Sequence, residues 1–88
     1  SSKNLVKLSI CESQLNPRAF NKDDFPTGSK GLFQYTEPTF LAFAKELGIT
    51  NPDIWNPYQQ IQLTAYLFSQ NKSYLWTCAR KHGIHGIK

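Results

Sequence analysis

The chain has 88 residues, a length at which a single hydrophobic core is only just sufficient for stability. Hydrophobic residues make up 40% and aromatic residues 14%, which argues against disorder and predicts one compact domain over residues 1–88. The net charge of +4 suits an anionic partner, but the Lys and Arg residues are scattered, which argues against a nucleic-acid binder.

The sequence predicts neither a membrane-spanning helix nor an N-terminal signal peptide. No apolar run approaches the roughly 20 residues of a membrane-spanning helix, and no signal-peptide pattern opens the sequence. The polar start "SSKN" leads straight into a helical pattern. We therefore interpret the chain as an excised domain or a fragment of a longer protein.

The first predicted helix covers residues 3–13. Leu5, Leu8 and Glu12 recur at helical spacing on one face, and the proline at position 17 follows the end of the helix. Glu12 thus shares an apolar face, in a last turn where the helix dipole disfavours negative charge. Both effects raise the pKa of the carboxyl, as a general acid requires. The alternative is a helix that ends earlier and leaves Glu12 as a solvated carboxylate, and the pattern alone leaves both open.

A long irregular segment follows over residues 16–35. Loops of this length are usually either functional or disordered. It contains the motif "GSKGLFQ", whose glycines allow tight turns and close approach to a ligand, while Ser29 and Gln34 offer hydrogen-bonding groups. Taken alone, the motif also fits an ordinary turn before a buried segment.

Two further helices have clear end signals. One begins with Thr36 as its N-cap and ends at Gly48. The next begins with Asn56 as its N-cap and Pro57 at its first position, and Gln59 completes a capping box. Apolar residues on several faces predict that this helix is the most buried element. One face carries Tyr58, Ile61, Ala65 and Phe68, and other faces carry Leu63, Tyr66 and Leu67.

The last predicted helix starts after Ser73 and ends before Gly83, with Leu75, Cys78 and Ala79 pointing inward. No strand pattern is convincing, although "GLFQY" at positions 31–35 could pair briefly. The predicted fold class is all-α, a small helical domain with at most a minimal hairpin-like loop in place of a sheet.

The two cysteines, Cys11 and Cys78, fit no zinc motif. A bridge between them would close a long loop and stabilise the fold by on the order of 4 kcal/mol. Two free thiols in the core are the alternative, and the residues alone leave both open. His82 and His85 have no further ligand at tetrahedral spacing, so no metal site is predicted.

Several motifs are more specific together than separately. They are "ES" at 12–13, "NP" with an alanine at 16–19, "GSKGLFQ" at 28–34, and "NP…QI…AYL" at 56–67. In this order and spacing, over roughly residues 5–70, the chain resembles the lysozyme-like lytic transglycosylases of the soluble and goose-type branch. The resemblance implies a lysozyme-like domain that cleaves the β-1,4 bond between N-acetylmuramic acid and N-acetylglucosamine in peptidoglycan, without a cofactor.

The resemblance also implies roles for particular residues. In that family the glutamate of "ES" is the catalytic acid, and this role falls on Glu12. The serine and glutamine of the glycine-bounded motif line the sugar cleft, which places Ser29, Gly31 and Gln34 there. The tyrosine of the "YL" pair corresponds to Tyr66.

One segment departs from the family pattern. The later "AYNAG"-like motif, which supplies a cleft tyrosine, is absent, and "SYLWTCARKHG" stands in its place. Trp76 and Tyr74 are candidate sugar-stacking replacements, and the alternative for both is a core role, the favoured one for Tyr74. In lysozyme-like folds the last helix can pack near the first, so a Cys11–Cys78 bridge is expected if the domain acts outside the cytoplasm.

The expected reaction depends on the number of carboxylates. A hydrolase needs a second carboxylate, about 5–5.5 Å away when retaining or about 6.5–9.5 Å when inverting. Asp23, Asp24 and Glu37 are the candidates. Lytic transglycosylases manage with one glutamate, because the 6-hydroxyl of the sugar attacks the anomeric carbon and leaves a 1,6-anhydro end.

We therefore expect anhydro products, made by a monomer that acts in the periplasm, outside the cell or at the cell wall. The expected partner is the peptidoglycan glycan strand, and no nucleic acid is expected. The alternatives are a hydrolytic muramidase and a catalytically inactive peptidoglycan-binding module.

Overall fold

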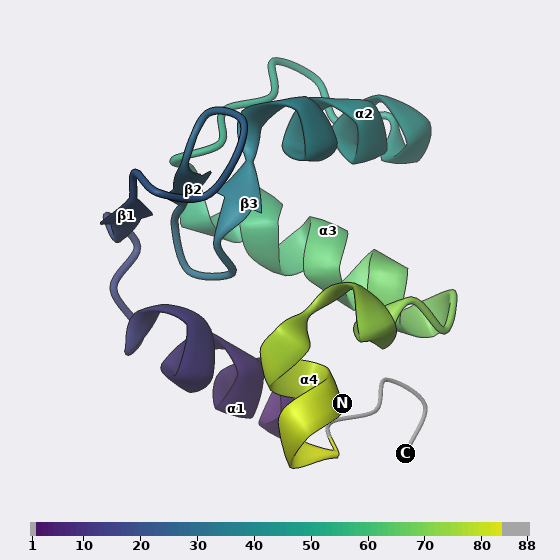
Figure 1. Ribbon diagram of the computed structural model, residues 1–88. Helices are drawn as coiled ribbons and strands as arrows, with labels where there is room; N and C mark the ends of the chain where they lie inside the picture. Colours follow the sequence, from purple (N-terminus) through teal and green to yellow (C-terminus); the bar gives the residue numbers. More distant parts are fainter. Residues whose placement is uncertain (1, 84–88) are drawn as a thin grey trace.

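The computed structural model describes residues 2–83, which fold into a small, mostly helical structure (Figure 1). The elements in chain order are α1 (Ser2–Ser13), β1 (Phe20–Asn21), β2 (Ser29–Lys30), β3 (Tyr35–Thr36), α2 (Glu37–Leu47), α3 (Pro57–Ser69), the 3₁₀ helix η1 (Ser73–Leu75) and α4 (Thr77–His82). The predicted fold class is confirmed, since helices dominate and the strands form only a minimal sheet.

The strands form an antiparallel sheet in the order β1-β2-β3. Phe20 pairs with Lys30, and Ser29 pairs with Thr36. The "GLFQY" segment contributes only its tyrosine to a strand, because residues 31–34 form the turn between β2 and β3. In Figure 1 this sheet lies between α1 and α2, and α3 runs through the middle of the molecule.

The core surrounds α3, as its apolar composition predicted, but of the face that carries Tyr58, Ile61, Ala65 and Phe68 only Phe68 is buried. Tyr58 is 80% exposed, and Ile61 is 40% exposed. The residues of α3 that are buried are Gln60, Leu63, Thr64, Leu67 and Phe68. Two of these side chains, Gln60 and Thr64, are polar. They can be buried because each has hydrogen-bond partners inside the protein.

The helix ends follow the sequence closely. Thr36 is the N-cap residue of α2, and Gly48 ends α2 with the left-handed backbone that glycine adopts readily. Asn56 caps α3, its side-chain oxygen accepting hydrogen bonds from the backbone N–H groups of Tyr58 and Gln59. The predicted capping box is wrong, because the Gln59 side chain instead contacts the backbone of residues 51 and 53.

The last predicted helix is divided in the structure. η1 ends at Leu75, and α4 begins at Thr77. Trp76 lies between them with an extended backbone. This break turns Leu75 outward, where it is 44% exposed, and buries Trp76. Ala79 is buried and Cys78 is partly buried, as predicted.

Candidate active site

Glu12 lies in the last turn of α1, on the side of the helix that faces the core. Leu8, one turn earlier, is fully buried, and Leu5 and Glu12 are half-buried. The helix stops at Ser13, and the next two residues have positive φ angles. The carboxyl of Glu12 is therefore held at the end of an apolar helix face, partly shielded from water.

This environment raises the pKa of Glu12. The largest cause is desolvation by burial, which penalises the charged form. The negative charge of Asp24 raises the pKa further, and a hydrogen bond from the backbone N–H of Cys78 lowers it. The net effect is a carboxyl that keeps its proton to a higher pH than an ordinary glutamate, which is the property of a proton donor.

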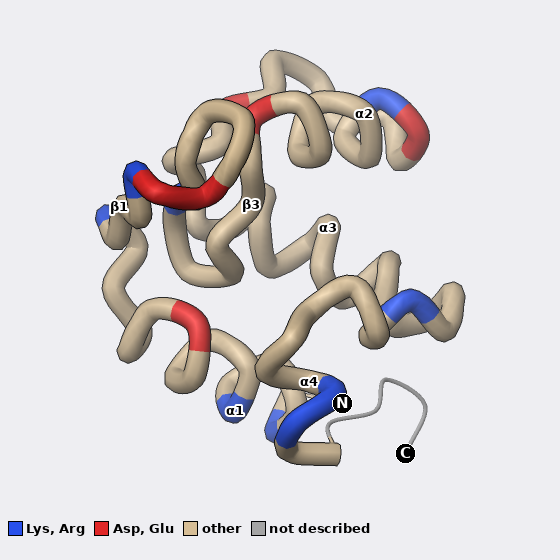
Figure 2. Tube along the Cα trace, in the orientation of Figure 1, with Lys and Arg blue, Asp and Glu red and all other residues tan. Residues whose placement is uncertain are grey.

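Asp24 and Ser29 form a hydrogen-bonded pair. The buried Ser29 hydroxyl donates a hydrogen bond of 2.6 Å to Oδ2 of Asp24, in the loop between β1 and β2. In Figure 2 the acidic segment of this loop lies above the acidic turn of α1, on the same side of the molecule. Ser29, predicted to line a sugar cleft, thus fixes the orientation of a carboxylate whose charge reaches Glu12.

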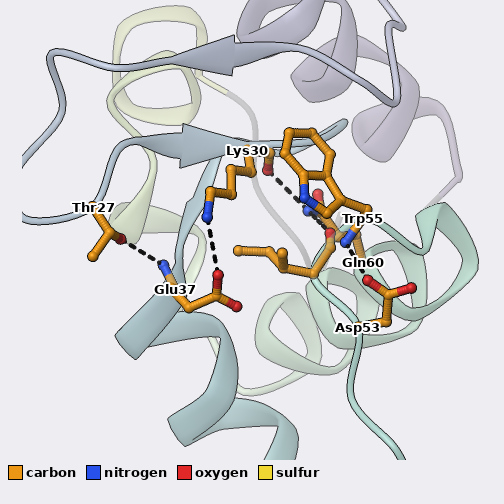
Figure 3. A network of polar contacts seen from close by, with 7 residues as sticks. Thr27, Lys30, Glu37, Asp53, Trp55 and Gln60 are labelled. Carbon is orange, nitrogen blue, oxygen red and sulfur yellow. Dashed lines mark hydrogen bonds and ion pairs between the residues drawn. The ribbon is translucent and has the colours of Figure 1, made fainter.

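The other two predicted carboxylates are engaged differently. Glu37, at the start of α2, forms an ion pair of 3.0 Å with Lys30 (Figure 3). Asp23 is exposed, and its backbone N–H donates to the side chain of Asn21. Of the three candidates, Asp24 is the one whose charge acts on Glu12.

Gln60 of α3 holds the "GSKGLFQ" loop in place. Its buried side-chain amide donates to the carbonyl of Lys30 (Figure 3) and to that of Ile54, and its Oε1 accepts from the N–H of Phe33. Gly31 lies against this amide, which fills the space of a Cβ. The "QI" pair of the quoted motif contains Gln60, but nothing in the sequence around it indicated this role.

Gln34 is the last residue of the same loop, and its backbone has a positive φ of 56°. Its amide donates to the carbonyls of Gly31 and Ala19, at 3.0 and 3.3 Å. It borders a hollow of about 250 Å³ whose other lining residues are Tyr35, Thr36, Thr39, Phe43, Leu75 and Trp76. Polar groups of the loop and of the start of α2 thus meet an apolar wall, a surface that suits a sugar.

A larger hollow of about 620 Å³ lies between the segment after α1 and the start of α3. It is lined by Pro17, Arg18, Trp55 and Pro57. Neither this hollow nor the one beside Gln34 is lined by Glu12 or by the Asp24–Ser29 pair, so neither by itself marks the site of acid chemistry.

Of the two aromatic residues of the last segment, Trp76 is buried and Tyr74 is exposed. Trp76 is only 6% exposed, its Nε1 donates to the Phe33 carbonyl, and its ring meets the edges of Tyr35 and Phe68. This leaves too little ring surface for a sugar to stack on Trp76. Tyr74, for which the core was the favoured expectation, is 56% exposed. Tyr66 is half-buried and packs against the core.

A disulfide joins Cys11 on α1 to Cys78 on α4, with 6.1 Å between the two Cα atoms. The structure therefore contains the bridge rather than two free thiols. Among residues 2–83 no group of three His, Cys, Asp or Glu side chains could hold a metal ion, and His85 lies outside the described residues. No helix within that range is long and apolar enough to cross a membrane.

Comparison with protein-family models places the chain in a family. A family model described as the transglycosylase SLT domain matches residues 1–80, a range that contains Glu12, the Asp24–Ser29 pair and both cysteines. No curated protein and no solved structure matches the chain significantly.

Proposed function

Because the chain belongs to the transglycosylase SLT domain family, we propose that it is a lytic transglycosylase with Glu12 as its single catalytic acid. The bond cleaved is the β-1,4 linkage between N-acetylmuramic acid and N-acetylglucosamine in peptidoglycan. The observation that carries the proposal is the half-buried Glu12 carboxyl with its raised pKa. A carboxyl that keeps its proton near the working pH can donate it to a leaving oxygen.

In this reaction Glu12 acts twice, first as a proton donor and then as a proton acceptor. Glu12 donates its proton to the glycosidic oxygen, and the bond from that oxygen to the anomeric carbon of N-acetylmuramic acid breaks. The 6-hydroxyl of the same sugar then attacks the anomeric carbon, and its proton passes to the Glu12 carboxylate. The product carries a 1,6-anhydro ring, and Glu12 is again protonated for the next cycle.

Asp24 is suited to assist this step electrostatically. Positive charge develops on the sugar as the glycosidic bond breaks, and a fixed negative charge nearby stabilises it. The hydrogen bond from Ser29 holds the Asp24 carboxylate in one orientation. A second candidate function follows from the same pair, because a carboxylate here could instead activate a water molecule and make the domain a muramidase.

The third possibility is a module that binds peptidoglycan without cutting it. The absent "AYNAG"-like motif favours it, while the buried acid disfavours it. In either case the polymer is reached in the periplasm, outside the cell or at the cell wall. The Cys11–Cys78 bridge supports such an oxidising location. We propose that the domain acts as a monomer.

The test compares the protein with Glu12→Gln on purified sacculi. We expect the variant to pellet with sacculi as the parent protein does, but to release less than a few per cent of the soluble fragments. Glu46→Gln, on the exposed surface of α2, is the matched control and should remain active. An active Glu12→Gln variant with unchanged circular dichroism would refute the role of Glu12. Binding of the parent protein without any soluble product would identify a binding module.

A further inference from the structure

The side of α1 that faces solvent carries an apolar stripe bordered by lysines. Val6 and Ile10, which lie four residues apart, are 49% and 48% exposed. Lys3 and Lys7 have the same spacing beside them and are also exposed. With about 3.6 residues per helical turn, this side of α1 lies roughly opposite Glu12, which is on the side that faces the core.

Helix α4 adds two more cations to the same end of the molecule. Arg80 and Lys81 lie in its last turn, and both are exposed. The disulfide between Cys11 and Cys78 holds α4 against α1. In Figure 2 the blue segments of α1 and α4 lie close together in the lower half of the view, and the acidic segments of the β1–β2 loop and of α2 lie in the upper half. We call Lys3, Val6, Lys7, Ile10, Arg80 and Lys81 together the basic patch.

The positive charge of the basic patch is not balanced inside the protein. Helices α1 and α4 together contain four Lys and Arg residues, and their single acidic residue is Glu12. Within residues 2–83 none of these four cations pairs with a carboxylate, and the ion pair found there joins Lys30 to Glu37. Lys3 and Lys7 repel each other at i, i+4 spacing, which lowers the stability of α1. The charge therefore complements an anionic partner rather than the fold itself.

Two open hollows lie in the basic patch, with volumes of about 490 and 310 Å³. The larger is lined by Lys7, Ile10, Cys11 and His82, and the smaller by Ser2, Lys3, Val6 and Lys7. Each hollow thus combines a branched aliphatic side chain with a cation. An anionic polymer would pair with the cations but would offer nothing to the aliphatic side chains. A phospholipid bilayer offers phosphate groups to the cations and acyl chains to the aliphatic groups.

We propose that the basic patch binds the surface of an anionic phospholipid bilayer. Its four cations lie at the headgroup phosphates, and Val6 and Ile10 enter the boundary between headgroups and acyl chains. Helix α1 has 12 residues, fewer than the roughly 20 of a spanning helix, so it lies along the surface. Glu12 then faces away from the bilayer, where a glycan strand can approach it. The binding itself does not depend on the proposed cleavage of peptidoglycan.

The first test is cosedimentation of the protein with vesicles, at low salt and without peptidoglycan. We expect binding to vesicles made of equal amounts of phosphatidylglycerol and phosphatidylcholine, and none to vesicles of phosphatidylcholine alone. The binding should be largely lost in about 1 M salt, where the Debye length is only about 3 Å. No binding to the anionic vesicles at low salt would overturn the proposal.

The second test removes the same charge from two different places. Lys3→Gln together with Lys7→Gln should weaken vesicle binding by about thirtyfold, because each cation near an anionic surface contributes about fivefold. The matched control is Lys22→Gln together with Lys45→Gln, on the β1–β2 loop and on α2, which changes the net charge equally. The control should weaken binding by less than about threefold. Equal losses would show that binding follows the net charge, and would overturn the assignment to the basic patch.

The third test separates a bilayer from an anionic polymer. Ile10→Ser should weaken vesicle binding by about fivefold, because the bilayer no longer buries its side chain. Leu41→Ser, at a residue of α2 that is 43% exposed, is the control and should bind as the parent protein does. Poly(glycerol phosphate), which has phosphate groups but no acyl chains, should bind more weakly than the vesicles. Equal binding of this polymer, or no effect of Ile10→Ser, would overturn the bilayer as the partner.

A further measurement needs no variant and decides the matter if a variant does not fold. Vesicles that contain a lipid with a paramagnetic doxyl group on its acyl chain should broaden the amide signals of Val6 and Ile10. The amide signals of α2 should stay sharp in the same sample. Broadening of α2 without broadening of α1 would overturn the proposal. Because these experiments contain no peptidoglycan, a protein that binds vesicles but releases nothing from sacculi would refute only the proposed cleavage.

Discussion

The side-chain amide of Gln60 occupies the space that a Cβ on Gly31 would need. Gln60 is fully buried in α3, and its amide bonds Lys30, Ile54 and Phe33. Helix α3 therefore sets the position of the "GSKGLFQ" loop, which contains both Ser29 and Gln34. The glycine is required for packing within the protein, and its predicted contact with a sugar stays a prediction.

The first prediction is that Gly31→Ala strongly destabilises the fold. At a φ of 84° a side chain costs about 1 kcal/mol or more, and the new methyl group also displaces the Gln60 amide from its partners. We expect a total loss of about 3 kcal/mol in the free energy of unfolding. Urea denaturation monitored by circular dichroism measures it.

Gly48→Ala is the matched control for this prediction. Gly48 has nearly the same φ, 82°, but nothing lies within 4 Å of the position that a Cβ would take there, so only the backbone term remains. A loss of about 1 kcal/mol is expected in this variant. Equal losses in the two variants would show that the Gln60 contact contributes nothing.

The ends of the helices could be predicted from the sequence, but the inward face of α3 could not. Asn56 and Gly48 act on their own backbone neighbourhood, so local residues suffice to identify them. Gln60 and Thr64 are inward because their partners come from the segment between Lys30 and Tyr35, far away in the sequence. Helical spacing of apolar residues carries no information on such partners.

In the candidate site, too, some residues could be placed from the sequence and others could not. Glu12 could be located by its spacing from Leu5 and Leu8, because a helix fixes which residues share a face. The choice between Asp23 and Asp24 could not be made, since a loop has no such period. The exposure of Tyr74 and the burial of Trp76 depend on the break between η1 and α4, for which the sequence has no glycine or proline signal.

The second prediction concerns stability and pH in Glu12→Gln. The pKa of Glu12 is raised in the folded state, so between its ordinary value of 4.5 and the folded value the native protein binds more protons than the unfolded chain. Stability therefore falls as pH rises through this window and stays lower above it. Glutamine is neutral throughout, and its amide oxygen can still accept from Cys78.

The variant should therefore be more stable than the parent protein at neutral pH, and the difference should vanish below pH 4.5. Urea denaturation of both proteins at several pH values measures the difference directly, since the other carboxyls are common to both. A difference that is independent of pH would contradict the raised pKa of Glu12.

The third prediction uses Asp24→Asn to test the coupling of the two carboxyls. The Asp24 charge raises the pKa of Glu12, so removing that charge lowers the pKa. The alkaline limb of the pH–rate profile on sacculi should therefore move to lower pH. Glu37→Gln is the control, because Glu37 is paired with Lys30, and it should leave the limb in place. A limb that responds equally to both variants would argue against a specific Asp24–Glu12 interaction.

The last prediction decides between transglycosylation and hydrolysis. If Glu12 is the single essential carboxyl, mass spectrometry of the released fragments should show 1,6-anhydro-muramic acid ends, one water lighter than reducing ends. Asp23→Asn, Asp24→Asn and Glu37→Gln should each lower the rate by less than the roughly 10²-fold typical of losing an acid or base. We expect this outcome because Asp24 is exposed and one of its oxygens already accepts from Ser29, an arrangement that holds the charge in place rather than a water molecule. If Asp24→Asn instead abolishes cleavage and the parent protein leaves reducing muramic acid, the domain is a muramidase with Asp24 as its base.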